Sequence, residues 1–180
     1  MRIIAGQWRG RPLVAPKGDA TRPTADRTRE ALFSMLASRL GDFEELAVAD
    51  LFAGSGALGL EALSRGAARC LFVEQDKAAL DALRANIAKL GASGTEVRAA
   101  SVLSLGPASA PLDLVMMDPP YGTGAGNVAL DRLARLGWIG AGTWVSIETA
   151  REEKVDVAGF TVDADRVHGR ARLTLLRLAA

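Results

Sequence analysis

The stretch DLFAGSGALGLEALSRGA (residues 50–67) decides the fold that we predict for this chain. It joins a short apolar run to a helical pattern through a loop in which Gly54, Gly56 and Gly59 match the G-x-G-x-x-G fingerprint of dinucleotide-binding folds. Twenty residues after Gly54 comes Glu74, where such folds place a ribose-binding carboxylate. A strand, a glycine loop and a helix in this order predict a ligand site at the carboxyl edge of a parallel sheet.

The rest of the chain alternates in the way that a parallel sheet requires. Apolar runs typical of strands occupy residues 46–52, 68–74, 95–100, 111–118 and 143–149, and helical patterns occupy 57–66, 76–91 and 127–136. Because these strands are apolar on both faces, we expect helices on both sides of the sheet. Two further β-rich runs within residues 159–178 predict an antiparallel hairpin, which makes the fold a seven-stranded, mostly parallel α/β sheet with a closing hairpin.

The N-terminal residues form a separate pattern. Residues 2–16 show a short alternation of apolar and polar side chains that Gly6 and Gly10 interrupt, which predicts a β-hairpin ahead of the main fold. A helix is expected to begin at Pro23 and Thr24, with Thr24 as its N-cap. We therefore divide the chain into a basic extension, residues 1–23, and a main domain, residues 24–180.

Composition excludes several classes of protein. With 49% hydrophobic and 24% charged residues the chain has an ordinary water-soluble composition, and no apolar run is long enough to span a bilayer. The N-terminus lacks the pattern of an export signal, so we expect a cytoplasmic protein without membrane contact. One cysteine and one histidine form neither an internal disulfide nor a usual zinc site, so we expect no metal. Nothing in the sequence indicates more than a monomer.

Positive charge gathers at the two ends of the sequence. The net charge is +1, but residues 1–29 hold seven Lys and Arg against two acids, and Arg166, Arg170, Arg172 and Arg177 cluster near the C-terminus. Two solvated surface hairpins would explain these clusters, and so would a rim that binds phosphate groups.

The residue that opens the quoted stretch discriminates between ligands. Asp50 stands four residues before Gly54, where a carboxylate repels a diphosphate and suits a cation. S-adenosylmethionine has no phosphate and carries an ammonium group and a positive sulfonium, so Asp50 favours this methyl donor. Glu74 can accept hydrogen bonds from the ribose hydroxyls of a dinucleotide or of the methyl donor, and therefore does not discriminate.

A second motif, DPPY (118–121), follows the expected strand at 111–118 and reaches the same edge of the sheet. D-P-P is also an ordinary turn after a strand. However, Asp118 and the carbonyl of Pro119 can accept the two hydrogens of an exocyclic amine and direct its lone pair, while the rigid prolines hold both acceptors in place. Tyr121 can stack on a base, a contact worth about 1–3 kcal/mol. The motif therefore predicts methyl transfer to a planar amine.

These motifs resemble those of the class I S-adenosylmethionine-dependent amino-methyltransferases, which have a Rossmann-like fold. The segments RIIAGQWRGRPL (2–13) and RPTADRTREALF (22–33) are similar to those of the bacterial family that methylates guanine N2 in 16S ribosomal RNA of the small subunit. The resemblance covers essentially the whole chain. It implies that the partner is 16S rRNA, in a small-subunit particle or an assembly intermediate.

The resemblance also implies three groups of site residues. The methyl donor is expected at Asp50, Phe52, Gly54, Ser55, Gly56, Glu74, Gln75, Ser101 and Val102. The target guanine is expected at Asp118, Pro119, Pro120 and Tyr121. RNA is expected at Arg2, Trp8, Arg9, Arg11, Arg22, Thr24, Arg27, Arg29, His168 and Arg170.

Some of these roles have alternatives. Trp8 can stack on a base or cover the core. Arg22, Arg27 and Arg29 can bind RNA phosphate or the carboxylate of the donor, and a surface ion pair with Glu30 would also explain Arg29. Ser101 stands where the family commonly has an acid for the adenine amine, and His168 stands where a tyrosine is more usual.

Other functions remain compatible with parts of the sequence. DPPY also serves enzymes that methylate adenine N6 in DNA or a glutamine amide in a protein. A nucleotide-dependent oxidoreductase and a non-catalytic RNA-binding module are alternatives from other classes.

Overall fold

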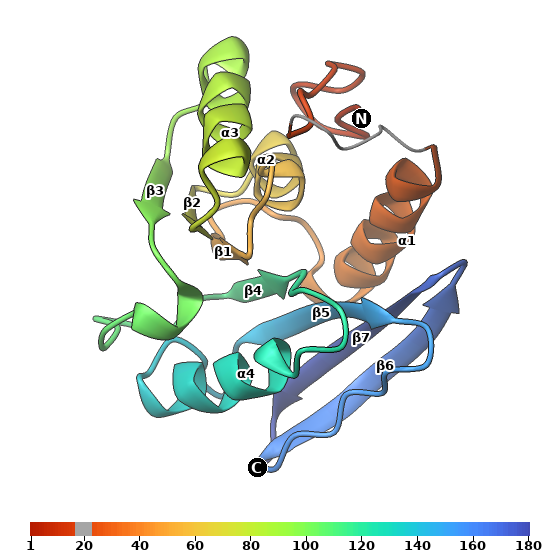
Figure 1. Cartoon of the computed structure of the whole chain (residues 1–180), viewed down its shortest axis with the longest axis vertical. Coiled ribbons are helices and arrows are strands. Elements are labelled where there is room, and N and C mark those ends of the chain that lie inside the picture. Colours follow the sequence, from red (N-terminus) through yellow and green to blue (C-terminus); the bar gives the residue numbers. More distant parts are fainter. Residues whose placement is uncertain (17–22) are drawn as a thin grey trace.

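A seven-stranded sheet runs through the protein, with helices on both of its faces (Figure 1). The computed structural model describes residues 1–16 and 23–180. The strand order is β3-β2-β1-β4-β5-β7-β6, with bounds β1 Ala47–Leu51, β2 Arg69–Glu74, β3 Thr95–Ala99, β4 Leu114–Met117, β5 Trp144–Ala150, β6 Phe160–His168 and β7 Ala171–Leu178. Strands β1 to β5 pair in parallel, and the β6–β7 hairpin joins β5 in antiparallel fashion. The predicted fold class is confirmed.

The helices divide into two layers. Helices α1 (Pro23–Leu40), α2 (Ala57–Ser64) and α3 (Lys77–Leu90) cover one face, where Leu36, Leu60 and Leu83 pack with Phe72 of β2. Helix α4 (Ala125–Arg135) and the short 3-10 helix η1 (Val102–Ser104) cover the other face. Because both faces are covered, β1 and β4 are buried along their whole lengths, and their residues are apolar except for Asp50.

The sheet order decides where ligand-binding side chains can meet. β1 lies between β2 and β4, and Leu51 is paired with Met117 across the β1–β4 ladder. The carboxyl ends of β1 and β4 are therefore neighbours, and the connections that follow them begin side by side. This edge is the place where open α/β sheets bind ligands.

Two helix starts differ from the sequence prediction. Helix α1 begins at Pro23, so Thr24 is inside the first turn and the N-cap prediction for Thr24 is wrong. Proline is favourable at the first helical position because the amide hydrogen at that position makes no hydrogen bond within the helix, so its absence in proline costs nothing. Helix α4 begins at Ala125, earlier than expected, after Gly124 with a φ of 71°. For α3 the predicted cap is present, since the Asp76 carboxylate accepts from the Ala79 amide at 3.0 Å.

The N-terminal segment reverses direction but forms little β-structure. Its antiparallel pairing is an isolated bridge between Arg2 and Pro12, supported by a bond from the Ile3 amide to the Arg11 carbonyl at 2.9 Å. The expected hairpin is thus reduced to a compact loop, because the residues between these positions form bends and turns. Ile3 is buried in the same core as α1 and α2. The division at residue 23 stays a prediction.

Within the described ranges, no helix is long and apolar enough to cross a membrane.

Candidate active site

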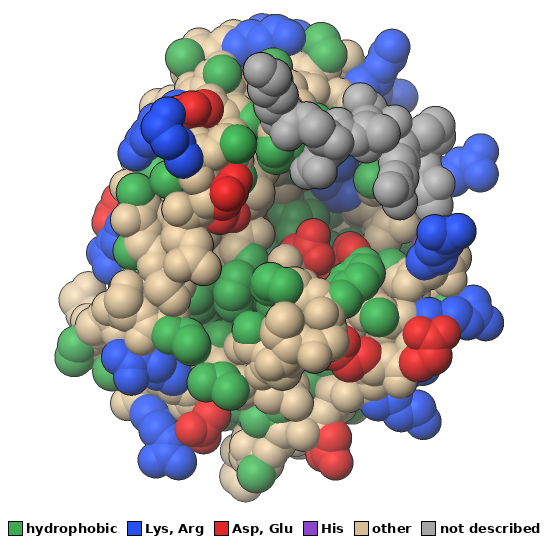
Figure 2. All heavy atoms as spheres, in the orientation of Figure 1, with side chains coloured by type: hydrophobic (Ala, Val, Ile, Leu, Met, Phe, Trp, Pro, Cys, Tyr) green, Lys and Arg blue, Asp and Glu red, His purple; other side chains and the backbone are tan. Residues whose placement is uncertain are grey.

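A cleft of about 730 Å³ opens at the carboxyl ends of β1, β4 and β5. Its walls come from the glycine loop, from α1, from the N-terminal segment and from the β6–β7 turn. In Figure 2 a hollow lies near the middle of the visible face, with acidic side chains inside it and Lys and Arg side chains around the margin of the molecule. Acidic side chains therefore lie inside the cleft, and basic side chains lie on the surface around it.

Gly54 and Gly59 of the fingerprint have different roles. Gly54 borders the cleft with a φ of 57°, and a Cβ there would meet no atom within 4 Å. Gly59 lies in α2 against the sheet, where a Cβ would fall 2.4 Å from Cε1 of Phe72 and 2.6 Å from Sγ of Cys70. Gly59 is thus required for helix packing, whereas Gly54 leaves the backbone open to a ligand.

Asp50 is buried beneath this loop, with 1% of its surface exposed. Its Oδ2 accepts a hydrogen bond from the Gly59 amide at 2.9 Å. Its Oδ1 has no hydrogen-bond partner among the described residues, although Asp50 lines the cleft. Burial raises the pKa of Asp50 well above its ordinary value, and the charges of Asp118 and Glu74 raise it further. A buried, partly unsatisfied carboxyl next to other acids favours a cationic ligand.

The DPPY turn brings a second carboxyl into the cleft. The Asp118 amide lies 3.5 Å from the Leu51 carbonyl, which ties the start of the turn to the end of β1. The Asp118 side chain faces the open cleft, yet the surrounding protein disfavours its charged form, and together with the charge of Glu148 this raises its pKa to about 8. Such a carboxyl accepts and releases a proton near neutral pH.

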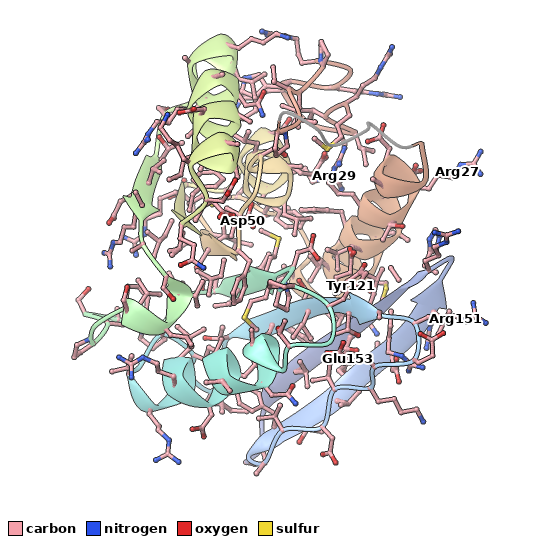
Figure 3. All side chains as sticks on the ribbon, in the orientation of Figure 1. Arg27, Arg29, Asp50, Tyr121, Arg151 and Glu153 are labelled. Carbon is pink, nitrogen blue, oxygen red and sulfur yellow. The ribbon has the colours of Figure 1, made fainter. Side chains whose placement is uncertain are left out.

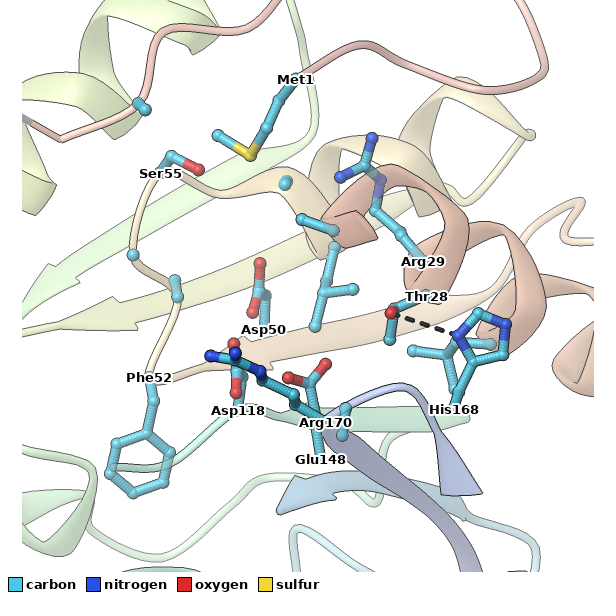
Figure 4. Close-up of a pocket in the computed structure, with 18 of the residues that line it drawn as sticks. Met1, Thr28, Arg29, Asp50, Phe52, Ser55, Asp118, Glu148, His168 and Arg170 are labelled. Atoms are coloured by element: carbon cyan, nitrogen blue, oxygen red, sulfur yellow. Dashed lines mark hydrogen bonds between the residues drawn. The ribbon is translucent and has the colours of Figure 1, made fainter. Parts of the chain in front are cut away.

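Glu148, at β5, completes the acidic group and was missed by sequence reasoning. Its Oε2 accepts a hydrogen bond from the Tyr121 hydroxyl at 3.0 Å, while Tyr121 as a whole is 51% exposed. Asp50, Asp118 and Glu148 all face the same space in Figure 4. A sequence signal existed, because an acid near the end of the strand after DPPY would be adjacent to Asp118 if the two strands were neighbours.

Several predicted donor residues line the cleft and several do not. Asp50, Phe52, Gly54 and Ser55 line it, as do Asp118 and Tyr121 of the predicted guanine group. Within the described part of the chain, the lining does not include Gly56, Glu74, Gln75, Ser101, Val102, Pro119 or Pro120.

Glu74 has a different set of partners from the expected ribose. Its carboxylate accepts from the amides of Gly54 at 2.7 Å and of Gln75 and Asp76 at 2.9 Å each. It therefore fixes the glycine loop to the end of β2. Ser101 caps η1 by accepting from the Leu103 amide at 3.2 Å, and its neighbour Val102 is buried.

The predicted RNA residues are mostly exposed. Arg2, Arg9, Arg11, Arg27 and Arg170 have exposed side chains, and Figure 3 shows Arg27 extending outward from α1. Arg170 also lines the cleft. His168, the last residue of β6, lines it too, and its Nδ1 lies 3.4 Å from the Thr28 hydroxyl. Trp8 is half-buried against the core beneath it. Arg22 and the side chain of Thr24 lie outside the described residues.

Arg29 is buried, unlike the other arginines of the predicted RNA group. Its guanidinium pairs with Asp26 at 3.1 Å and with Glu61 at 3.6 Å, and it donates to the Arg2 carbonyl. The alternative of a surface pair with Glu30 is therefore wrong, because Arg29 points into the protein. Its place in the cleft wall leaves contact with a small ligand possible, whereas its burial disfavours contact with an RNA phosphate.

Two buried polar side chains hold the N-terminal segment over the site, and neither was expected. Glu61 of α2 accepts from the amides of Ile4 at 2.9 Å and Ala5 at 3.0 Å and also pairs with Arg65. Asn86 of α3 bonds both the amide and the carbonyl of Val14 and also donates to the Ser55 carbonyl at 3.0 Å. Asn86 therefore links the N-terminal segment directly to the glycine loop.

No group of three or more His, Cys, Asp or Glu residues in the described ranges could hold a metal ion.

The fold and the cleft together define a class I methyltransferase, a class that takes its methyl group from S-adenosylmethionine. The chain belongs to the family described as Conserved hypothetical protein 95, whose family model matches residues 1–177.

Named relatives and solved structures agree with this assignment. The chain is 37% identical to Ribosomal RNA small subunit methyltransferase D of Escherichia coli (strain K12), over 100% of the chain and 91% of the relative. Identity to the protein of the same name from Haemophilus influenzae is 36%, over 85% of the chain and 80% of that relative. The solved structure of yhhF from Escherichia coli has a TM-score of 0.85 at 37% identity and covers 100% of this chain and 98% of its own.

A more distant structure shows how widely the fold is shared. Magnesium protoporphyrin IX methyltransferase from Synechocystis PCC 6803, solved with bound SAM, has a TM-score of 0.70 at 15% identity, over 90% of this chain and 87% of its own. At this identity the likeness concerns the fold alone.

Proposed function

We propose that this protein transfers a methyl group from S-adenosylmethionine to the exocyclic N2 amine of a guanine in 16S rRNA of the small ribosomal subunit. One observation carries the proposal: the DPPY turn and the glycine loop begin side by side at the ends of β4 and β1, and both reach one acidic cleft. The names of the Escherichia coli and Haemophilus influenzae relatives support a small-subunit rRNA substrate.

The residues of the cleft fit a cationic methyl donor. When bound, S-adenosylmethionine supplies an electrophilic methyl group on a positively charged sulfur. The unsatisfied Oδ1 of Asp50 and the raised pKa values of Asp50 and Asp118 favour a ligand that returns positive charge to the cleft. Gly54, with open space beside it, allows close approach to the loop.

Asp118 and Pro119 act on the accepting amine. The Asp118 carboxylate accepts one N–H hydrogen bond and the Pro119 carbonyl accepts the other, which orients the nitrogen lone pair away from the turn. As the new N–C bond forms and the C–S bond breaks with its electron pair on sulfur, the nitrogen gives up a proton. A carboxyl whose pKa is about 8 can take that proton at its oxygen.

The basic surroundings suit an RNA partner. Arg170 lies at the cleft and Arg27 stands on the adjacent helix, so both can meet phosphates of an RNA whose target base enters the cleft. The substrate is 16S rRNA, within a small-subunit particle or an assembly intermediate. The enzyme acts as a monomer in the cytoplasm.

The test is a transfer assay with methyl-labelled S-adenosylmethionine. The wild-type protein is incubated with naked 16S rRNA or with small-subunit particles that lack the modification, and the labelled nucleoside is identified by mass spectrometry after digestion. We expect label in N2-methylguanosine at one position. Absence of transfer to either form would overturn the proposal, and label in N6-methyladenosine would move the activity to another planar amine.

A matched pair of variants tests the role of Asp118. Asp118→Ala should still bind the donor but lose nearly all turnover, because the amine loses its acceptor. Asp131→Ala, which changes an exposed carboxylate on α4, should keep wild-type turnover. Near-normal turnover of Asp118→Ala would show that the amine is activated elsewhere.

A further inference from the structure

Glu148 lies beside Asp118 because of the strand register. β4 and β5 pair in parallel, with Met117 opposite Ile147. The next residues on the two strands are Asp118 and Glu148, so their backbones lie one inter-strand spacing apart, about 5 Å. Both side chains line the cleft and face the same space (Figure 4), and the charge of Glu148 acts directly on Asp118. The cleft therefore presents two adjacent carboxyls to whatever base enters it.

The Glu148 carboxylate has capacity beyond its bond to Tyr121. Its Oε2 accepts the Tyr121 hydroxyl, whereas an ionised carboxylate has about four acceptor positions. The Tyr121 hydroxyl fixes the orientation of the carboxylate, and Glu148 is half-buried in the wall. The Glu148 carboxylate is thus a hydrogen-bond acceptor of fixed orientation that lines the cleft next to Asp118, the proposed acceptor for the amine.

Guanine is the base that matches two adjacent acceptors. Its Watson–Crick edge carries the N1–H donor next to the N2 amine, so two neighbouring hydrogens point outward together. Adenine carries an acceptor nitrogen at N1 beside its amine, and that nitrogen would face a carboxylate oxygen with no hydrogen between them. A buried polar group left unpaired in this way is a strong basis for discrimination.

We propose that Glu148 determines base specificity by accepting the N1–H of the target guanine while Asp118 accepts an N2 hydrogen. This inference rests on the proposed guanine-N2 activity. The pair of carboxyls selects the 2-amino-6-oxopurine edge and repels a purine whose N1 is an acceptor. DPPY alone serves several planar amines, so the residue from β5 supplies the choice among them.

The experiment replaces the target guanine with 2-aminopurine, which keeps the 2-amine but has an acceptor at N1. After the methylated position has been mapped, that position is rebuilt as guanine or 2-aminopurine by ligation of a synthetic oligonucleotide into 16S rRNA. The ratio of kcat/KM for the two RNAs is measured for wild type, for Glu148→Gln and for Glu152→Gln. Glu152 is an exposed acid on the same chain segment, so its variant controls for the loss of one charge.

Wild type and Glu152→Gln should prefer guanine by roughly 100-fold or more, the scale expected when a buried acceptor is left facing another acceptor. Glu148→Gln should reduce that preference at least about tenfold, because the amide can donate to N1 of 2-aminopurine. A role limited to holding Tyr121 would lower both rates equally and leave the ratio unchanged.

Two results would overturn the inference while leaving the proposed function intact. One is an unchanged ratio in Glu148→Gln. The other is wild-type protein that methylates 2-aminopurine as fast as guanine, a measurement that needs no variant to fold. If wild-type protein transfers no methyl group to guanine, the proposed function fails first and the inference fails with it.

Discussion

Alanine substitutions at two glycines of the fingerprint, Gly59 and Gly54, should have similar effects on stability and different effects on ligand binding. In Gly59→Ala the new Cβ would lie 2.4 Å from the Phe72 ring and 2.6 Å from Cys70 Sγ, both in the buried core. Overpacking of this kind costs about 3 kcal/mol at the upper end of its usual range, and the better helix propensity of alanine returns about 1 kcal/mol. The net loss of stability should therefore be about 2 kcal/mol.

Gly54→Ala should cost a similar amount for another reason. A Cβ there meets no atom, but the φ of 57° is left-handed, and an L residue in that conformation costs about 1–2 kcal/mol. For a chain of 180 residues, either variant should lower Tm by roughly 3–8 °C. Stability alone does not separate the two variants.

Donor affinity separates them. The Gly54 methyl group would occupy space at the cleft that a ligand needs, so Kd for S-adenosylmethionine should rise at least about tenfold, equivalent to about 1.4 kcal/mol. The Gly59 methyl group would point at Phe72 and Cys70 and not into the cleft, so Kd should change less than about threefold. Isothermal titration calorimetry below both unfolding transitions measures each value. Equal losses of affinity in the two variants would refute the assignment of Gly59 to packing and Gly54 to the ligand.

Three further predictions concern Asp118, Glu61 and Asn86. The folded pKa of Asp118, about 8, exceeds its ordinary value of 3.8, so its contribution to stability is present at low pH and is lost as the pH rises through 8. Urea unfolding at pH 5 and at pH 9 should show that the free energy of unfolding depends less on pH in Asp118→Asn than in wild type, by about 1–2 kcal/mol after allowance for solvent exposure. The same pH dependence in both proteins would contradict the raised pKa. Glu61→Gln should lower the free energy of unfolding in urea by about 3 kcal/mol, because it removes the buried negative charge that pairs with Arg29 and Arg65. Asp131→Asn, in an exposed pair, should change the free energy of unfolding little. Asn86→Ala should cost about 2–3 kcal/mol and accelerate hydrogen exchange at the Val14 amide, and retained protection there would contradict the link to the N-terminal segment.

The fold was predictable because its signals are local. Continuous apolar runs separated by helical patterns fix parallel strands, and the Asp76 cap marks the start of α3. The meeting of Asp50 with Asp118 also followed, because both residues come at strand ends and parallel strands end at one edge. The predicted start of α1 was wrong because threonine is a favourable N-cap residue and Thr24 was given that role. Proline is favoured at the first position of a helix, and α1 begins at Pro23.

The remaining site residues depend on contacts that no local pattern contains. Glu148 reaches the site only because β5 lies beside β4 in a particular register. Glu61 and Asn86 bond backbone groups 57 and 72 residues away, at Ile4 and Val14. A polar residue on the apolar face of a helix indicates a buried partner, but it does not identify that partner.

The acidic lining of the cleft has a consequence for the end of each reaction cycle. Asp50, Asp118 and Glu148 are carboxyls whose charged forms a cationic ligand stabilises, so the net charge of a ligand affects how firmly it is held. Methyl transfer turns the sulfonium of the donor into a neutral thioether and leaves its shape almost unchanged. We therefore expect the spent donor to bind more weakly than the fresh one. The same carboxyls that capture the reagent would then promote release of the by-product and limit its inhibition of the enzyme.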